Sequence, residues 1–152
     1  MTRDETAAQA LRWLARRDYA AQELKQRLIM KGADNGTCED VISEMQELGY
    51  QSDERFTEVF VRQRLERRQG PRKIEWDLRS RGVDDTLIDA HLSSVADEVW
   101  IQNASEALRS RFPRPHDDLK QKAARQRFLV GRGFEHHHIR QALLYKNYDE
   151  YE

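Results

Sequence analysis

The segment RRQGPRKIEWDLRSRG, residues 67–82, contains the two signals that decide the fold. Gly70-Pro71 predicts the start of a helix, because proline is favoured in the first helical turn, where its missing N–H leaves no hydrogen bond unmade. Leu78-x-x-Arg81-Gly82 predicts the end of that helix, since a glycine just beyond the last turn readily adopts the left-handed conformation that closes it. The segment is therefore a short helix with both ends marked.

The same helix ending occurs three times, about fifty residues apart. Leu28-x-x-Lys31-Gly32 and Leu129-x-x-Arg132-Gly133 share it, so the glycines are 50 and 51 residues apart. Apolar residues follow the second and third glycines at offsets of six and ten. The first glycine fits the same offsets, at Val41 and Met45, if three extra residues are inserted after it. Self-similarity at this period is typical of stacked supersecondary units.

The fold class that follows is all-α: three tandem three-helix repeats, about nine helices and no strand. We place the repeats at residues 1–50, 51–95 and 96–152. Helix starts are expected at Thr37 with Asp40 as a capping box, at Ser52 and at Asp84, because such side chains accept hydrogen bonds from the first backbone N–H groups of a helix. Residues 112–115, Phe-Pro-Arg-Pro, predict a break inside the third repeat.

The composition favours a helical protein with much exposed surface. Of the 152 residues, 38% are apolar and 35% are charged, against about 45–50% and 25% in an average domain. Seven glycines and three prolines are few for the many turns of a β-sandwich. The single cysteine, Cys38, excludes an internal disulfide and suits a reducing cytoplasm. There is no apolar run long enough to span a membrane, so we expect a cytoplasmic protein without a membrane partner.

Charge is distributed along the chain in bands. Residues 12–31, 62–82 and 109–132 have net charges of +4, +5 and +6, and acidic bands separate them, so the total is only −1. Charges on separate faces do not cancel beyond a Debye length of about 8 Å. Any one basic band could be an ordinary solvated helix face, but three at a regular spacing favour a surface that binds an anionic partner. Trp76, inside the second band, could either pack against the core or stack on such a partner.

Motifs for catalysis are not found in the sequence. It contains no glycine-rich phosphate loop, no HExxH and no G-x-S-x-G. Cys38 is followed by Glu39 and Asp40, which disfavour a reactive thiolate. Residues 136–138 are three consecutive histidines, but side chains of consecutive helical residues point about 100° apart, so we expect a solvated helix start and no metal centre. We therefore predict a protein that is not an enzyme and needs no cofactor.

Several motifs together resemble the RecX family, bacterial regulators of the RecA recombinase. The central ones are Gly49-Tyr50-x-x-Asp53-x-Arg55-Phe56 and Gly70-Pro71-x-x-Ile74-x-x-x-Leu78-x-x-Arg81-Gly82-Val83, and the flanking ones are Ala10-Leu11-x-x-Leu14-x-x-Arg17, Glu23-Leu24-x-x-x-Leu28 and Arg127-Phe128-Leu129-x-x-Arg132-Gly133-Phe134. The chain departs from the family pattern at Gln51-Ser52, where Leu-Asp is common, and at Ala20, where a capping Ser is common. These changes affect helix capping and not the basic bands.

The resemblance implies an elongated, curved molecule that binds the RecA–DNA filament. It would limit filament growth, strand exchange, ATP hydrolysis and co-protease activity, in DNA repair by homologous recombination and in the SOS response. Single- or double-stranded DNA is a further expected partner, and a DNA-binding repeat protein that acts on single strands without RecA is the alternative function. The expected binding residues are the basic ones of the second and third bands: Arg62, Arg64, Arg67, Arg68, Arg72, Lys73, Arg79, Arg81, Lys122, Arg125, Arg127 and Arg132.

Overall fold

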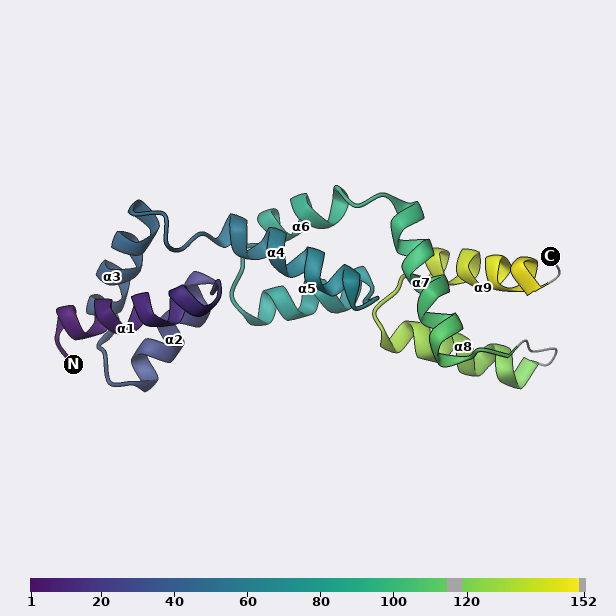
Figure 1. Cartoon of the computed structure of the whole chain (residues 1–152), viewed down its shortest axis with the longest axis horizontal. Coiled ribbons are helices and arrows are strands. Elements are labelled where there is room, and N and C mark those ends of the chain that lie inside the picture. The colour runs from purple at the N-terminus through teal and green to yellow at the C-terminus, as the bar shows by residue number, and fades with distance from the viewer. Residues whose placement is uncertain (115–118, 151–152) are drawn as a thin grey trace. The chain divides into compact units, whose positions relative to one another are not determined.

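A computed structural model describes the backbone of residues 1–114 and 119–150. Within these residues the chain forms nine α-helices and no strand, as predicted, and Figure 1 shows their order. The helices are α1 (Arg3–Arg16), α2 (Ala21–Met30), α3 (Asn35–Glu47), α4 (Asp53–Glu66), α5 (Pro71–Ser80), α6 (Asp85–Ser93), α7 (Asp97–Arg111), α8 (Leu119–Gly131) and α9 (His136–Glu150).

The three predicted helix endings have the same geometry. Gly32, Gly82 and Gly133 have φ values of +109°, +79° and +94°, a region that a residue with a Cβ atom enters only at a cost. In each ending, the residue that follows the glycine donates its N–H to the carbonyl of the leucine of the repeated pattern, four residues before the glycine. These bonds are Ala33 to Leu28 at 3.1 Å, Val83 to Leu78 at 3.2 Å and Phe134 to Leu129 at 3.1 Å. The repeat inferred from the sequence is therefore a repeat of local structure.

The helices after these glycines all begin at the same offset, which corrects one prediction. Helices α3, α6 and α9 begin three residues after Gly32, Gly82 and Gly133. The first repeat consequently has no insertion, and the buried position six residues after its glycine is Cys38. Burial among apolar groups, with Asp34 nearby, raises the pKa of its thiol, so Cys38 acts as a small apolar core residue.

The helix starts follow the predicted capping chemistry with one exception. Ser52 Oγ accepts from the N–H of Arg55 at 3.1 Å, and Asp84 Oδ1 accepts from the N–H of Thr86 at 2.8 Å. The capping box expected at Thr37 is wrong. Asp34 caps α3 instead, accepting from the N–H of Thr37 at 2.8 Å, and this hydrogen bond lowers the pKa of the Asp34 carboxyl.

Contacts divide the chain into two compact units, and the middle repeat contributes to both. The first unit comprises Met1–Phe60 and Leu78–Ile88, and the second comprises Val61–Asp77 and Asp89–Glu152. In the first, α1 packs against α2 and α3; in the second, α7 packs against α8 and α9. The first unit contains a core of Ala10, Tyr19, Leu24, Leu28, Ala33, Cys38, Val41, Ile42 and Met45. None of the described helices is long and apolar enough to cross a membrane.

Gln51, one of the departures from the family pattern, has a structural role in the first unit. Its buried amide Nε2 donates to the carbonyl of Tyr19 at 3.0 Å and to Asp53 Oδ1 at 2.9 Å. The same Asp53 oxygen accepts from the N–H of Ala21 at 2.8 Å. Asp53 therefore satisfies a backbone donor at the start of α2, where Ala20 has no side-chain oxygen to do so.

Leu78, the leucine of the second helix ending, is 0% exposed. We expect Leu78→Ala to lower the free energy of unfolding by about 2–5 kcal/mol, because it removes buried methyl groups and leaves a cavity. Denaturant unfolding followed by circular dichroism measures this change. Leu48→Ala is the matched control, since Leu48 is 60% exposed and its truncation should change stability by less than about 0.5 kcal/mol. Similar losses in the two variants would contradict the assignment of Leu78 to the core.

Candidate interaction surface

The turn between α4 and α5 packs directly against the turn between α8 and α9, within the second unit. The N–H of Gly70 donates to the carbonyl of Arg132 at 2.8 Å, and the N–H of Arg72 donates to the carbonyl of Gly133 at 2.9 Å. These bonds bring part of the second basic band beside part of the third. We call this region, residues 67–73 and 132–134, the basic junction.

Glycine is required at the basic junction because the two backbones come close together. A Cβ atom on Gly70 would lie 2.3 Å from the carbonyl carbon of Gly133 and 2.3 Å from the nitrogen of Phe134. A Cβ atom on Gly133 would lie 2.5 Å from Cβ of Lys73, in α5. Such separations are far below van der Waals contact, so any larger residue at either glycine forces the turns apart.

The first unit contains an equivalent close approach. A Cβ atom on Gly82 would lie 2.5 Å from Cβ of Gln22, in the first turn of α2, whereas one on Gly32 would meet nothing within 4 Å. The glycines of the second and third repeats thus each contact the middle helix of the repeat before them, whereas Gly32 makes no such contact within the part of the chain that the structure describes. This periodic contact is a second function of the repeated glycine, beyond its backbone conformation.

Several predicted binding arginines instead stabilise the basic junction and its flanks. Arg132 Nη2 donates to the backbone carbonyls of both Arg67 and Arg68, the latter at 3.1 Å. Arg68, which has a positive φ of 58°, forms an ion pair with Glu106 at 3.6 Å. Arg64 pairs with Asp77 at 3.2 Å, and both side chains are largely buried. The guanidinium of Arg132 thus holds the backbone of the α4–α5 turn, and those of Arg64 and Arg68 are occupied by acidic side chains of the same unit.

The predicted binding residues differ in how far they reach solvent. Arg125 does not lie on the surface as expected: it is 2% exposed, because its guanidinium donates to the carbonyl of Arg114 and lies 5.2 Å from the ring centre of Phe112. Five of the others are half-buried, namely Arg64, Arg68, Lys73, Arg81 and Arg132. The exposed ones are Arg62, Arg67, Arg72, Arg79, Lys122 and Arg127.

Two members of the predicted set, Arg79 and Arg81, belong to the first unit. Arg79 forms an ion pair with Asp85 at 2.7 Å. Arg81 lies 3.7 Å from a carboxylate oxygen of Glu23 and 4.9 Å from the ring centre of Phe60. The exposed Arg79–Asp85 pair contributes little to stability, but both pairs neutralise part of the positive charge of the second band.

Trp76 lies on the surface and not in the core, which answers the question that its sequence left open. Trp76 is 68% exposed, and it lines a shallow groove of about 440 Å³ in the second unit. The other residues of this groove are Arg72, Lys73, Asp77, Val130, Gly131 and Gly133. An exposed indole beside Arg72 and Lys73 combines an apolar stacking face with positive charge, the combination used to contact nucleobases or anionic protein surfaces.

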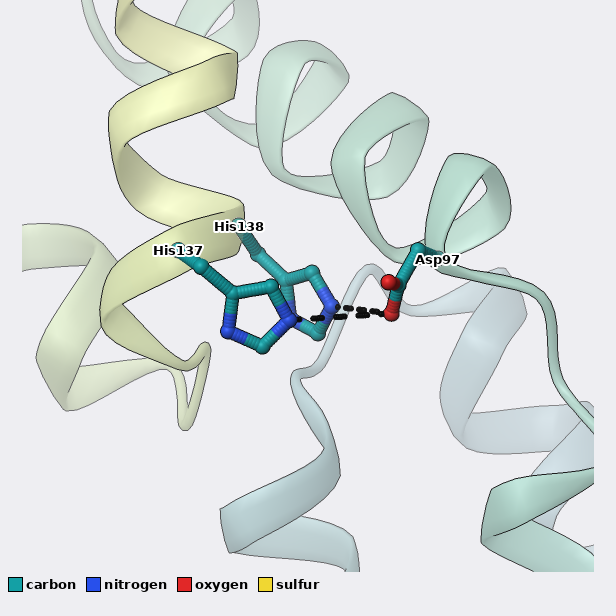
Figure 2. Close-up of side chains that lie close together, drawn as sticks. All are labelled: Asp97, His137 and His138. Carbon is teal, nitrogen blue, oxygen red and sulfur yellow. Dashed lines mark hydrogen bonds and ion pairs between the residues drawn. The ribbon is translucent and has the colours of Figure 1, made fainter.

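The histidine tract has a geometry that the sequence argument did not anticipate. His137 and His138, in the first turn of α9, both point their Nε2 atoms at Oδ1 of Asp97, the first residue of α7 (Figure 2). The separations are 3.6 Å for His137 and 2.9 Å for His138. The expectation that consecutive histidines cannot converge is therefore wrong, because rotation about the side-chain bonds brings two rings together even though their Cα–Cβ bonds diverge.

Comparison with known protein families finds a match for each of the three repeats. Three family models match in succession: the first three-helix domain of RecX over residues 8–45, the second over residues 52–92 and the third over residues 97–143. These matches follow the three groups of helices, α1–α3, α4–α6 and α7–α9.

Individual relatives agree with the family models. A regulatory protein RecX from Chromohalobacter salexigens is 41% identical over 136 residues, which are 90% of this chain and 89% of that one. One from Legionella pneumophila is 39% identical over 127 residues, 83% of this chain and 84% of the relative. The crystal structure of RecX from Lactobacillus salivarius has the same fold, with a TM-score of 0.82 and 19% identity over 95% of this chain and 96% of that one.

Proposed function

The chain belongs to the RecX family of regulatory proteins, and from this premise we propose that it regulates the RecA recombinase by binding the RecA–DNA filament. Bound there, it limits filament growth, strand exchange, ATP hydrolysis and co-protease activity. The observation that carries the proposal is the succession of the first, second and third RecX three-helix domains, in that order, across residues 8–143. As a member of a family of regulatory proteins, the chain is a regulator and not an enzyme.

The surface that binds the filament is proposed to be centred on the basic junction. Arg67 and Arg72 extend into solvent there, and Trp76 lies one helical turn after Arg72. Arginine offers two parallel donors to a carboxylate or phosphate, so it binds either more strongly than a neutral donor does. The backbone bonds between the two turns keep these side chains on a rigid base, which reduces the entropy lost on binding.

The proposal includes the place and organisation in which this binding occurs. The protein acts in the cytoplasm, where RecA filaments form on DNA. Its three repeats, residues 1–50, 51–95 and 96–152, each contribute one three-helix domain. An elongated, curved molecule remains a prediction. Small-angle scattering in solution tests it, and the scattering of a spherical particle would contradict it.

A second candidate function is single-strand DNA binding that needs no RecA. The exposed Trp76 favours it, because an aromatic ring between cationic side chains can stack on any base. The two functions differ in the preferred partner. A DNA-binding repeat protein would bind bare single strands at least as tightly as it binds the filament, and its affinity would decrease steeply with salt.

The test is to measure binding and inhibition together. We expect the protein to lower ATP hydrolysis and strand exchange by RecA in a dose-dependent manner, and to bind RecA–DNA filaments at least about tenfold more tightly than bare DNA of the same length. Fluorescence anisotropy with labelled DNA, with and without RecA, measures the affinities at one fixed salt concentration. Unchanged RecA activity at saturating protein would contradict the proposal, and equal or tighter binding to bare DNA would favour the alternative.

A further inference from the structure

Three metal-binding side chains converge where α7 and α9 begin. Figure 2 shows the imidazoles of His137 and His138 from α9 facing the carboxylate of Asp97 from α7. One ligand atom from each residue, two nitrogens and one oxygen, lies within 4.8 Å of the other two. All three residues belong to the second unit, in which α7 and α9 pack against each other.

The hydrogen bond between His138 and Asp97 does not by itself explain why His137 also faces the same carboxylate oxygen. His138 Nε2 lies 2.9 Å from Asp97 Oδ1, which is a normal hydrogen bond, but His137 Nε2 lies 3.6 Å from the same oxygen, which is too far for one. One carboxylate oxygen therefore attracts two imidazoles and bonds well to one. A cation between the three atoms would satisfy all of them at once.

Both distances to Asp97 are close to those around a tetrahedral ion. Ligand bonds of about 2.0–2.2 Å at tetrahedral angles place ligand atoms about 3.3–3.6 Å apart. The separation of 3.6 Å from His137 lies at the upper end of that range and the separation of 2.9 Å from His138 lies below it, so a sub-ångström shift of the exposed Asp97 carboxylate would bring both into the range. The rings of His137 and His138 already lie 3.9 Å apart between centres.

We propose that Asp97, His137 and His138 form a binding site for a divalent transition-metal ion, for which Zn²⁺ is the best match. Two imidazole nitrogens and one carboxylate oxygen are a donor set that suits Zn²⁺ and the ions near it in softness. Mg²⁺ and Ca²⁺ prefer all-oxygen sites, so this site discriminates against the Mg²⁺ that accompanies nucleotides and DNA.

The side chain of His138 is held in place by its neighbours, and the hollow beside the three residues has space for a further ligand. His138 is 3% exposed, and its ring lies 6.3 Å from that of the buried Trp100, so its orientation is fixed by packing. The three ligands line a hollow of about 370 Å³ whose other lining residues include Glu75, Asp89 and Glu135. A water molecule in this hollow can complete the coordination.

Such an ion would join the start of α7 to the start of α9. Because the ligands come from two helices that are distant in the sequence, the ion binds the folded second unit more tightly than the unfolded chain, and it stabilises the fold by mass action. We therefore expect Zn²⁺ to raise the unfolding temperature of the full-length protein, with one ion bound per chain.

Isothermal titration calorimetry with Zn²⁺, and the visible spectrum with Co²⁺ as a spectroscopic substitute, test the site. We expect His137→Ala and Asp97→Asn each to weaken Zn²⁺ binding by at least about 100-fold, since loss of even an outer-shell partner costs about 10–100-fold. Both variants should also abolish the rise in unfolding temperature. The side chains of His137 and Asp97 are 50% and 65% exposed, so circular dichroism should show that both variants keep their helices.

His136→Ala is the matched control, because His136 is adjacent and exposed but is not part of the converging set. It should keep the affinity of the parent protein within about twofold. An equal loss in His136→Ala would show that the histidine tract chelates metal without this geometry, and unchanged binding in His137→Ala would show that the site lies elsewhere. Either result, or a parent protein that binds no Zn²⁺ at micromolar concentrations, would overturn the proposal.

Discussion

Reversing the charge of Arg67 and Arg72 to glutamate together is expected to weaken binding to the RecA–DNA filament by about 100-fold or more. Both side chains are exposed on the basic junction, so they are available to a partner. Loss of one buried, hydrogen-bonded partner in an interface costs about 2–5 kcal/mol, and each 1.4 kcal/mol is about a factor of ten in affinity. Reversal adds repulsion to that loss. The unfolding temperature should change little, since exposed charges contribute little to folding.

The salt dependence of the same variant identifies the group to which the arginines bind. If the two arginines bind phosphates, the magnitude of the slope of log K against log salt should fall by about 0.7–0.9 for each phosphate that is no longer neutralised, and affinity for bare DNA should fall as well. If they bind acidic side chains of RecA, affinity for the filament falls while affinity for bare DNA stays almost unchanged. Trp76→Ala should weaken binding in the same assay by about 1–3 kcal/mol if its ring stacks on a base.

A double reversal elsewhere in the chain controls for net charge. Arg12→Glu with Arg16→Glu changes the total charge by the same amount; both residues are exposed on α1, in the first basic band, outside the basic junction and outside the predicted binding residues. This control should reduce filament affinity much less than the junction variant does. If both double variants inhibit RecA as well as the parent protein, the second basic band is an ordinary solvated face. If both lose affinity equally, long-range electrostatics and not the junction determine binding.

The second large effect is expected from Gly70→Ala, which should destabilise the second unit by about 3 kcal/mol or more. The new Cβ would lie 2.3–2.4 Å from three backbone atoms of residues 133 and 134. Backbone atoms cannot rotate out of the way as a side-chain end can, so the turns must separate. Separation also breaks the two hydrogen bonds between the turns, each worth about 1 kcal/mol. Denaturant unfolding of the full-length chain measures the loss.

Gly131→Ala provides the matched control, because the chemical change is identical and only the position differs. Gly131 is the last residue of α8, and a Cβ atom there would meet nothing within 4 Å. Alanine at such a position should leave stability unchanged or raise it by about 0.4–1 kcal/mol, because it restricts the unfolded chain. A Gly70→Ala variant as stable as Gly131→Ala would mean that the two turns do not pack together in solution.

Local sequence signals were enough to predict the helices and their repetition. The pattern Leu-x-x-(Lys/Arg)-Gly marks a helix end through a backbone conformation that depends mainly on the glycine itself, and Pro71, Ser52 and Asp84 mark helix starts in the same local way. Cys38 shows the limit of such patterns. Counting only typical apolar residues suggested an insertion after Gly32, whereas the core accepts a buried thiol at that position.

The sequence by itself thus determined the helical class, the three repeats and the bands of charge, because each depends on neighbours that are close along the chain. Only the tertiary structure decided which charged groups reach solvent. Arg125 is buried and Trp76 is exposed, the reverse of what residue type favours. The close approach of Gly70 to Gly133, and of His137 and His138 to Asp97, joins segments that are far apart in the sequence. No local pattern encodes such pairs, since they arise from how helices pack within a repeat and between neighbouring repeats, and from which side chains that packing excludes from water.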